Sequence, residues 1–134
     1  PSLSLLTLNA FAAADEVLIP MQCEYYALEG LSDLVGRIKR VGTNINPRLE
    51  IAGLLRTMYD PRNTLSHQVS EQLEEHFGVK VYRTLLPRNL RLAEAPSFGA
   101  PAVIWDRASK GAQAYLALAD EILARAGVVN GRAA

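Results

Sequence analysis

The chain has 134 residues, of which 49% are apolar, enough for one domain with a buried core. Its 14 basic and 14 acidic side chains balance. This balance excludes a bulk electrostatic attraction to nucleic acid or membrane, so such binding requires a local patch. A single cysteine, Cys23, excludes an internal disulfide framework and is typical of a reducing compartment. No apolar run approaches the roughly 18 residues of a membrane-spanning helix.

The first residues, PSLSLL, contain neither an initiating Met nor a signal peptide, so we expect the chain to be an excerpt that begins upstream. Within residues 1–14, Leu5, Leu8 and Ala12 share one helical face, and Ser2 or Ser4 can cap the helix. The next stretch, DEVLIP, is short and apolar and ends in proline. It predicts a buried strand.

Residues 25–46 repeat apolar positions at helical spacing and place Arg37, Lys39 and Arg40 on the opposite, solvated face; Pro47 ends this helix. Residues 49–59, LEIAGLLRTMY, are nearly continuously apolar. This composition is typical of a central parallel strand that is covered on both faces.

Expected helices and strands also alternate in the second half of the chain. DPRNT is a turn, and the spacing predicts a helix from Leu65 to Phe77 that Gly78 ends. VKVYRTLLP predicts a strand, PAVIWD a strand or a packed loop, and residues 115–123 lie in a C-terminal helix that Gly127 ends. The pattern predicts an α/β fold, a mostly parallel sheet flanked by helices, over residues 1–127, with a flexible tail at 128–134.

Polar residues follow each of three expected strands, in IPMQCEYYALEG, RTMYDPRNT and LLPRNLRLAEAPSFG. Ligands of open parallel sheets bind beyond the carboxyl ends of the strands, so we expect a site there. No glycine-rich phosphate loop or dinucleotide motif is present. His67 and His76 lie nine residues apart, too far for a shared ligand set, so we expect no metal site. Cys23 is interpreted as a packed small hydrophobe.

Three segments carry a resemblance to a known family: IPMQCEYYALEGLSDL, the run from TMYDPRNTL to EAPSFG, and DRASKGAQAYLALADEIL. Together they closely resemble the C-terminal half of the ParA/Soj family of deviant-Walker P-loop ATPases, from Pro1 to about Ala126. The resemblance implies ATP with Mg²⁺ as cofactor. It also implies that the phosphate loop, the Mg²⁺ ligands and the catalytic residues lie upstream, so none is expected in this chain.

The resemblance assigns three groups of residues. Thr57, Met58 and Asp60 resemble one wall of the adenine pocket, and Pro87 and Asn89 resemble the other. Glu24, Tyr25 and Tyr26 lie in a loop that approaches the nucleotide-sandwich dimer interface in relatives. Arg62 and Arg91 match surface arginines that bind DNA non-specifically, and Arg88 can assist either task.

Plainer interpretations of the same residues remain open. Arg62 can be an arginine that is simply solvated in an exposed turn, and Arg91 can pair with Glu94 on a helical turn. Glu24 can be an acid that the dipole of the following helix favours, and Met58 can be a core residue.

The resemblance implies an ATP-dependent homodimer that binds DNA and drives chromosome or plasmid segregation. Its expected partner is a ParB/Spo0J-like centromere-binding protein, and the expected location is cytoplasmic and nucleoid-associated. Two alternatives stay open. A MinD-like membrane-cycling ATPase would need a lipid-binding C-terminal helix, which the tail VVNGRAA does not offer. A non-enzymatic α/β interaction domain would need no nucleotide.

Overall fold

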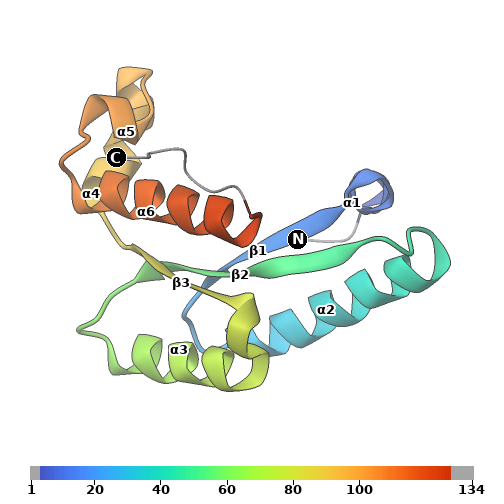
Figure 1. The fold of residues 1–134 in the computed structure, drawn as a ribbon. Helices are drawn as coiled ribbons and strands as arrows, with labels where there is room; N and C mark the ends of the chain where they lie inside the picture. The colour runs from blue at the N-terminus through green and yellow to red at the C-terminus, as the bar shows by residue number, and fades with distance from the viewer. Residues whose placement is uncertain (1–3, 128–134) are drawn as a thin grey trace.

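The computed structural model describes residues 4–127, which form a three-stranded parallel sheet in the order β1-β2-β3 with helices on both faces (Figure 1). The expected tail at 128–134 lies outside these residues. The elements are α1 (Leu5–Ala13), β1 (Glu16–Gln22), α2 (Ala27–Asn44), β2 (Glu50–Tyr59), α3 (Thr64–Phe77), η1 (Gly78–Lys80), β3 (Val81–Pro87), α4 (Leu90–Glu94), η2 (Ala95–Phe98), α5 (Ala102–Trp105) and α6 (Lys110–Arg125).

The α/β class is confirmed, and so is the central position of β2. Helices α2 and α3 cover one face of the sheet, and α6 covers the other (Figure 1). Successive residues of β2 serve the two layers, since Leu54 packs with α2 and α3 while Leu55 packs with Leu118 of α6. Period-two alternation in a strand with two covered faces explains why its sequence is almost uniformly apolar.

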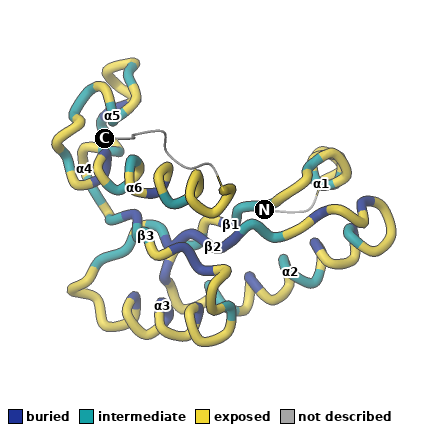
Figure 2. The backbone as a smooth tube through the Cα atoms, in the orientation of Figure 1, coloured by how far each residue is buried: buried dark blue, intermediate teal, exposed yellow. Residues whose placement is uncertain are grey.

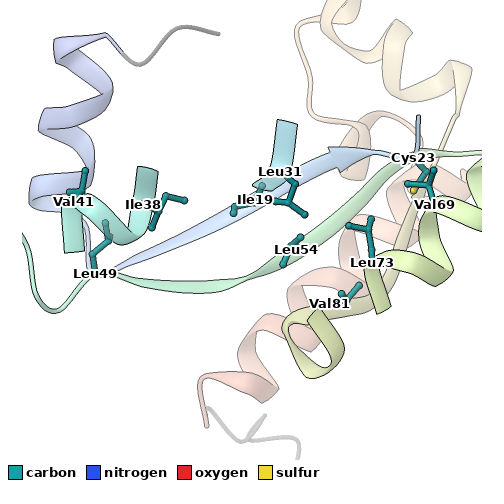
Figure 3. Packing of buried hydrophobic residues seen from close by; sticks show 10 residues of the cluster. All are labelled: Ile19, Cys23, Leu31, Ile38, Val41, Leu49, Leu54, Val69, Leu73 and Val81. Carbon is teal, nitrogen blue, oxygen red and sulfur yellow. The ribbon is translucent and has the colours of Figure 1, made fainter. Parts of the chain in front are cut away.

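The larger core layer lies between the sheet and helices α2 and α3. Figure 3 shows ten of its side chains, contributed by β1, α2, β2, α3 and β3 together with the residues that flank β1 and β2. Leu31, Leu54 and Leu73 are its largest fully buried members. The burial map shows the same arrangement, with the buried backbone concentrated on the strands and on the inner faces of α2 and α3 (Figure 2).

The PAVIWD prediction is wrong, because this segment is neither a strand nor a loop. Residues Ala102–Trp105 form the short helix α5, whose first turn closes when the Pro101 carbonyl accepts the backbone N–H groups of Ile104 and Trp105, both at 2.9 Å. Ile104 is 75% exposed, so this apolar run lies on the surface rather than in the sheet.

Strand β3 approaches β2 unusually closely at Gly53. A Cβ atom at Gly53 would lie 2.6 Å from the Lys80 carbonyl oxygen and 2.7 Å from a ring carbon of Tyr82. Only glycine leaves room for this approach.

Beyond Gly53 the β2–β3 ladder becomes irregular. Leu54 stands opposite Val81, and Arg56 stands opposite Leu85, so β3 uses four residues where β2 uses two. We call residues 82–84 the β3 bulge. A bulge leaves backbone groups without ladder partners, and these groups must find other ones.

Arg56 of β2 occupies the inner side of the β3 bulge. Its side chain is only 4% exposed. Its Nη2 donates to the carbonyl oxygens of Tyr82 at 2.8 Å and Arg83 at 3.4 Å. Its Nη1 donates to Ser70 Oγ at 2.7 Å and to the Glu74 carboxylate, both on α3. Arg56 therefore replaces missing ladder bonds and fastens α3 to the sheet.

Glu121 of α6 binds the outer side of the same bulge. Its carboxylate accepts the backbone N–H groups of Arg83 at 2.8 Å and Thr84 at 2.9 Å, and also the Thr84 hydroxyl at 2.8 Å. Arg125, one turn further along α6, donates to the Val81 carbonyl at 2.9 Å and to Glu121 at 3.0 Å. The outer edge of β3 is thus closed by side chains instead of a fourth strand.

These contacts predict a pH-dependent stability. Partial burial pushes the pKa of Glu121 up, but the Arg83 and Thr84 backbone N–H groups, the Thr84 hydroxyl and Arg125 outweigh it and lower the pKa to about 2 from 4.5. Because the folded-state pKa is below the unfolded value, the stabilisation is complete above about pH 5 and is lost as the pH falls towards 2. Because Glu121 is only partly buried, solvent screening reduces this stabilisation to about 1–3 kcal/mol.

Urea denaturation between pH 6 and pH 2.5 measures this effect. The variant Glu121→Gln should show a clearly shallower loss of stability than the wild type across the acidic window. Glu75→Gln, which alters an exposed carboxylate on α3, is the matched control and should keep the wild-type slope. If the free energy of unfolding of the wild type and of Glu121→Gln falls equally steeply with decreasing pH, Glu121 is not the source of the pH dependence.

Candidate functional site

The carboxyl ends of β1, β2 and β3 meet at one edge of the sheet, as parallel strands require (Figure 1). A hollow of about 290 Å³ lies there, close to the lower end of the roughly 300–1,000 Å³ that small-molecule sites span. We call it the strand-end pocket. Its lining residues are Gln22, Cys23, Glu24, Met58, Asp60, Asn63, Leu65, Ser66 and Arg88.

Four of the residues singled out from the sequence share this pocket: Glu24, Met58, Asp60 and Arg88. They come from three different strand ends, so the tertiary fold alone brings them together. They lie up to 64 positions apart in the sequence, and their proximity agrees with the site expected beyond the strand ends.

Met58 has the one positive φ angle among the non-glycine residues of the described chain, at 52°. It coincides with the second irregularity of the β2–β3 ladder, where β2 advances three residues and β3 only two. The Met58 side chain is 42% exposed at the pocket, so it is not a core residue. Strained backbone of this kind costs about 1–3 kcal/mol and is concentrated at functional sites.

Asp60 is held between two arginines. Its carboxylate accepts the Arg62 backbone N–H at 3.0 Å, and it also accepts Arg62 Nε at 3.1 Å and Nη2 at 3.0 Å. These side-chain and backbone hydrogen bonds from Arg62 lower the pKa of Asp60, and the charge of Arg88 adds to the effect. Asp60 is therefore an ionised hydrogen-bond acceptor at the pocket mouth, whereas Arg62 remains 89% exposed.

Thr57, Pro87 and Asn89 frame the strand-end pocket and do not line it, whereas Arg88 does line it. Thr57 pairs with Gln22, and Pro87 stands opposite Tyr59 at the end of the sheet. The Arg88 backbone N–H then donates to the Tyr59 carbonyl at 3.1 Å. The Asn89 side chain caps α4 by accepting the Arg91 N–H at 3.0 Å, so its oxygen faces the helix.

Tyr25 and Tyr26 do not line the strand-end pocket. Each is 73% exposed, and their rings meet edge to face with centroids 5.1 Å apart. They immediately follow Glu24 and immediately precede α2. Two neighbouring exposed aromatic rings are unusual on a solvated surface and enriched in protein interfaces.

Arg91 lies on α4, beyond the pocket. Its guanidinium contacts Glu94 at 3.2 Å and Asp106 at 3.4 Å, and it lies 5.5 Å from the Trp105 ring centroid. The pairing with Glu94 that the sequence left open is present, and the Asp106 contact adds a bridge to the end of α5. Arg91 stays 55% exposed.

The sequence reasoning missed Ser66 and Asn63. Ser66 is buried and donates to the Cys23 carbonyl at 3.3 Å, which joins α3 to the end of β1. Asn63 caps α3 by accepting the Leu65 N–H at 3.0 Å. The Asn in DPRNT, a cap residue directly before a helical repeat, is the signal that could have located this wall. Cys23 is a packed residue, and burial raises the pKa of its thiol although Arg56 opposes this.

No three metal-binding side chains gather anywhere in residues 4–127. The strand-end pocket thus offers an ionised acceptor (Asp60), a cation (Arg88) and apolar surface (Met58), without a metal-ligand set.

Comparisons with known proteins agree with this architecture. A family model described as "AAA domain" matches residues 1–51. The structure of cobyrinic acid a,c-diamide synthase from Mycobacterium smegmatis with bound ADP and magnesium aligns with a TM-score of 0.73 and 34% identity, over 98% of this chain and 46% of that chain. The Pyrococcus furiosus cell division ATPase MinD aligns at 0.69 and 25% identity, over 90% and 47%. The fold is that of a P-loop ATPase sheet.

Sequence relatives specify the family. An uncharacterised protein of Pseudomonas putida is 66% identical over 93% of this chain and 48% of its own length. The chromosome partitioning protein ParA of Caulobacter vibrioides is 54% identical (93% and 47%). The sporulation initiation inhibitor protein Soj of Bacillus subtilis is 52% identical (92% and 49%). The chain belongs to the ParA/Soj family of chromosome-partitioning ATPases, and it spans about half the length of these relatives.

The strained backbone at Met58 generates a prediction. Met58→Gly should leave the free energy of unfolding unchanged or raise it by up to about 1 kcal/mol, because glycine adopts positive φ freely. Thr57→Gly is the control at the neighbouring strand position, and it should lower the free energy of unfolding by about 1 kcal/mol. Urea denaturation of both variants decides the matter. An equal loss for both would mean that Met58 carries no backbone strain.

Proposed function

We propose that this chain is the C-terminal half of a ParA-type ATPase, and that the strand-end pocket holds part of the adenine base of ATP. The observation that carries the proposal is the pocket itself. It gathers Met58, Asp60 and Arg88 from the carboxyl ends of parallel strands, the place where ligands of such sheets bind, in a chain 54% identical to a chromosome partitioning protein.

The residues present fit a base better than a phosphate–metal group. Met58 in the pocket lining, and Pro87 in the frame next to Arg88, offer apolar surface for a ring, and the ionised Asp60 can accept a hydrogen bond from an exocyclic amine. Mg²⁺ would need oxygen ligands, usually carboxylates together with substrate phosphates, and the described residues supply no such cluster. In this proposal the phosphates and Mg²⁺ are held by an upstream half, whose electrostatic stabilisation of phosphoryl transfer drives ATP hydrolysis.

Dimerisation is the second part of the proposal. Tyr25 and Tyr26 supply exposed aromatic area next to Glu24, which lines the pocket. An interface there would bury both rings close to the nucleotide. The association state would then depend on the bound nucleotide, as an ATP-dependent homodimer requires.

Non-specific DNA binding is the third part. Arg62, Arg88 and Arg91 all follow strand ends, at the same end of the sheet as the pocket, and all three are exposed. Arg62 and Arg91 form exposed pairs with carboxylates, and exposed pairs exchange readily for a phosphate because water already screens them. A dimer doubles these contacts on one molecule, so weak phosphate binding gains through avidity.

With DNA binding, the proposed location is cytoplasmic and nucleoid-associated, and the proposed partner is a ParB/Spo0J-like centromere-binding protein. A membrane-cycling ATPase is the second candidate, favoured by the structural similarity to MinD at 25% identity. The 52–54% identity to ParA and Soj favours partitioning more strongly. Across residues 4–127, none of the helices has the length and apolar content needed to cross a membrane.

Pro87→Gly tests the base-binding wall in the full-length protein. The substitution removes the ring surface and loosens the backbone, so the affinity for ATP should fall by about tenfold, equivalent to about 1.4 kcal/mol. DNA binding should weaken only at ATP concentrations that no longer saturate the variant. Pro96→Gly, at an exposed proline of η2, is the matched control and should bind ATP normally. An unchanged ATP affinity in Pro87→Gly would refute the assignment of Pro87 to the base-binding wall.

Arg91→Ala tests the DNA-binding surface by salt titration of the ATP-bound, full-length protein. Each phosphate contact contributes about 0.9 to the slope of log K against log salt. Two contacts per dimer are lost, so the slope should fall by roughly 1.8 and all sequences should weaken alike. Arg62→Ala should behave in the same way.

Arg37→Ala is the control for this titration. Arg37 forms an equivalent surface pair with Asp33 at 2.9 Å on α2, and its removal should leave the slope unchanged. If Arg91→Ala also leaves the slope unchanged, its function is limited to bridging Glu94 and Asp106.

A further inference from the structure

We propose that Arg56 and Glu121 are positioning residues for the nucleotide site: by fixing the β3 bulge, they set where Pro87, the last residue of β3, and Arg88, which lines the strand-end pocket, lie. The inference rests on the proposed base-binding function of Pro87. Neither side chain lines the pocket, so both would act through the backbone of β3.

The alignment of β3 against β2 shows what the bulge does. A regular ladder starting from the Leu54–Val81 pair would place Arg83 opposite Arg56, but Leu85 stands there. Two residues are therefore taken up in the bulge. Straightening it, with the rest of the ladder unchanged, would carry Pro87 two residues, or about 6–7 Å, past Tyr59.

Hydrophobic patterning cannot prevent such a slip. Side chains alternate between the faces of a sheet with a period of two, so a shift of two residues returns every side chain to its original face. The apolar residues Tyr82 and Leu86, which pack against α6, would still face α6 after the shift. A specific polar contact is needed to select one alignment over the other.

Arg56 and Glu121 supply that contact from opposite sides. Arg56 binds the carbonyl oxygens of Tyr82 and Arg83, and Glu121 binds the N–H groups of Arg83 and Thr84. The two charges thus hold both ends of the same two peptide groups, 82–83 and 83–84. This arrangement exists only while these peptides are bulged out of the ladder.

Burial makes the selection strong. Arg56 is 4% exposed and so cannot exchange its partners for water, whereas Glu121 is 16% exposed and only partly shielded from it. In the straightened alignment the Arg56 guanidinium would lose its carbonyl acceptors inside the sheet, which is costly for a buried charge. At the pocket, the hydrogen bond from the Arg88 N–H to the Tyr59 carbonyl then completes the alignment.

The test compares nucleotide discrimination in the full-length protein. Arg56→Met retains the length and apolar stem of the side chain but removes its hydrogen bonds. If the loss of these bonds displaces Pro87, the ratio of the affinity for ATP to the affinity for GTP should fall at least fivefold. Glu121→Gln should narrow it in the same direction, and it serves as the deciding variant if Arg56→Met does not fold.

The matched control is Leu73→Ala, which removes a fully buried side chain of α3 and lowers the melting temperature without removing any polar group that binds the β3 bulge. It should keep the ATP-to-GTP ratio within twofold of the wild type. The inference is overturned if the folded Arg56 or Glu121 variant keeps the wild-type ratio, or if Leu73→Ala changes it equally. If Pro87→Gly also leaves the ratio unchanged, the base-binding wall itself is wrong and the positioning role fails with it.

Discussion

The structure depends on a buried guanidinium in the middle of its sheet. Arg56 lies in the apolar central strand, where an unpaired charge would be strongly destabilising, yet four protein acceptors surround its two terminal nitrogens. Its Nε alone lacks a partner. Leaving a buried charge without its partners typically costs about 3–5 kcal/mol. The position of α3, the path of β3 and, through β3, the carboxyl edge of the sheet all follow from satisfying this one charge.

The consequence is a polar connection between the two helical layers. From α3, Glu74 binds Arg56, which binds the carbonyl groups of the β3 bulge; the N–H groups of the same peptides bind Glu121 of α6, and Glu121 binds Arg125. Positive and negative groups alternate along this path, so each group is stabilised by its neighbour. Both layers also have apolar contacts, but apolar packing is non-directional and tolerates slippage. The polar path specifies one alignment, and we regard it as the reason that the pocket residues converge.

The sequence predicted the elements well because their signals are local. The helical spacing of residues 25–46, the Gly at the end of α3 and the apolar run of β2 each depend on near neighbours. The candidate site was partly predictable, since Glu24, Met58, Asp60 and Arg88 follow strand ends.

The helix in PAVIWD was missed because four residues are too few to show a helical period, and Pro101 supplied its first turn. The structural role of Arg56 was not predicted, because Arg56 lies within an apolar run and its hydrogen-bond partners are 14 to 27 positions away in the sequence. The bulge has no sequence signature, since a two-residue slip preserves the alternation.

Under the proposed ParA-type function this rigidity has a purpose, because the proposed base-binding residue Pro87 and the proposed DNA-contacting residues Arg88 and Arg91 lie within one short segment of the chain. Amide hydrogen exchange of the full-length protein measures the central claim most directly. The Arg83 and Thr84 amides lie at the open edge of the sheet and donate to a carboxylate rather than to a neighbouring strand. The account predicts that they exchange as slowly as the amides of Leu54 and Leu55, and that Glu121→Gln accelerates both. Exchange as fast as that of the exposed residues Ser97 and Phe98 in the wild type would contradict it.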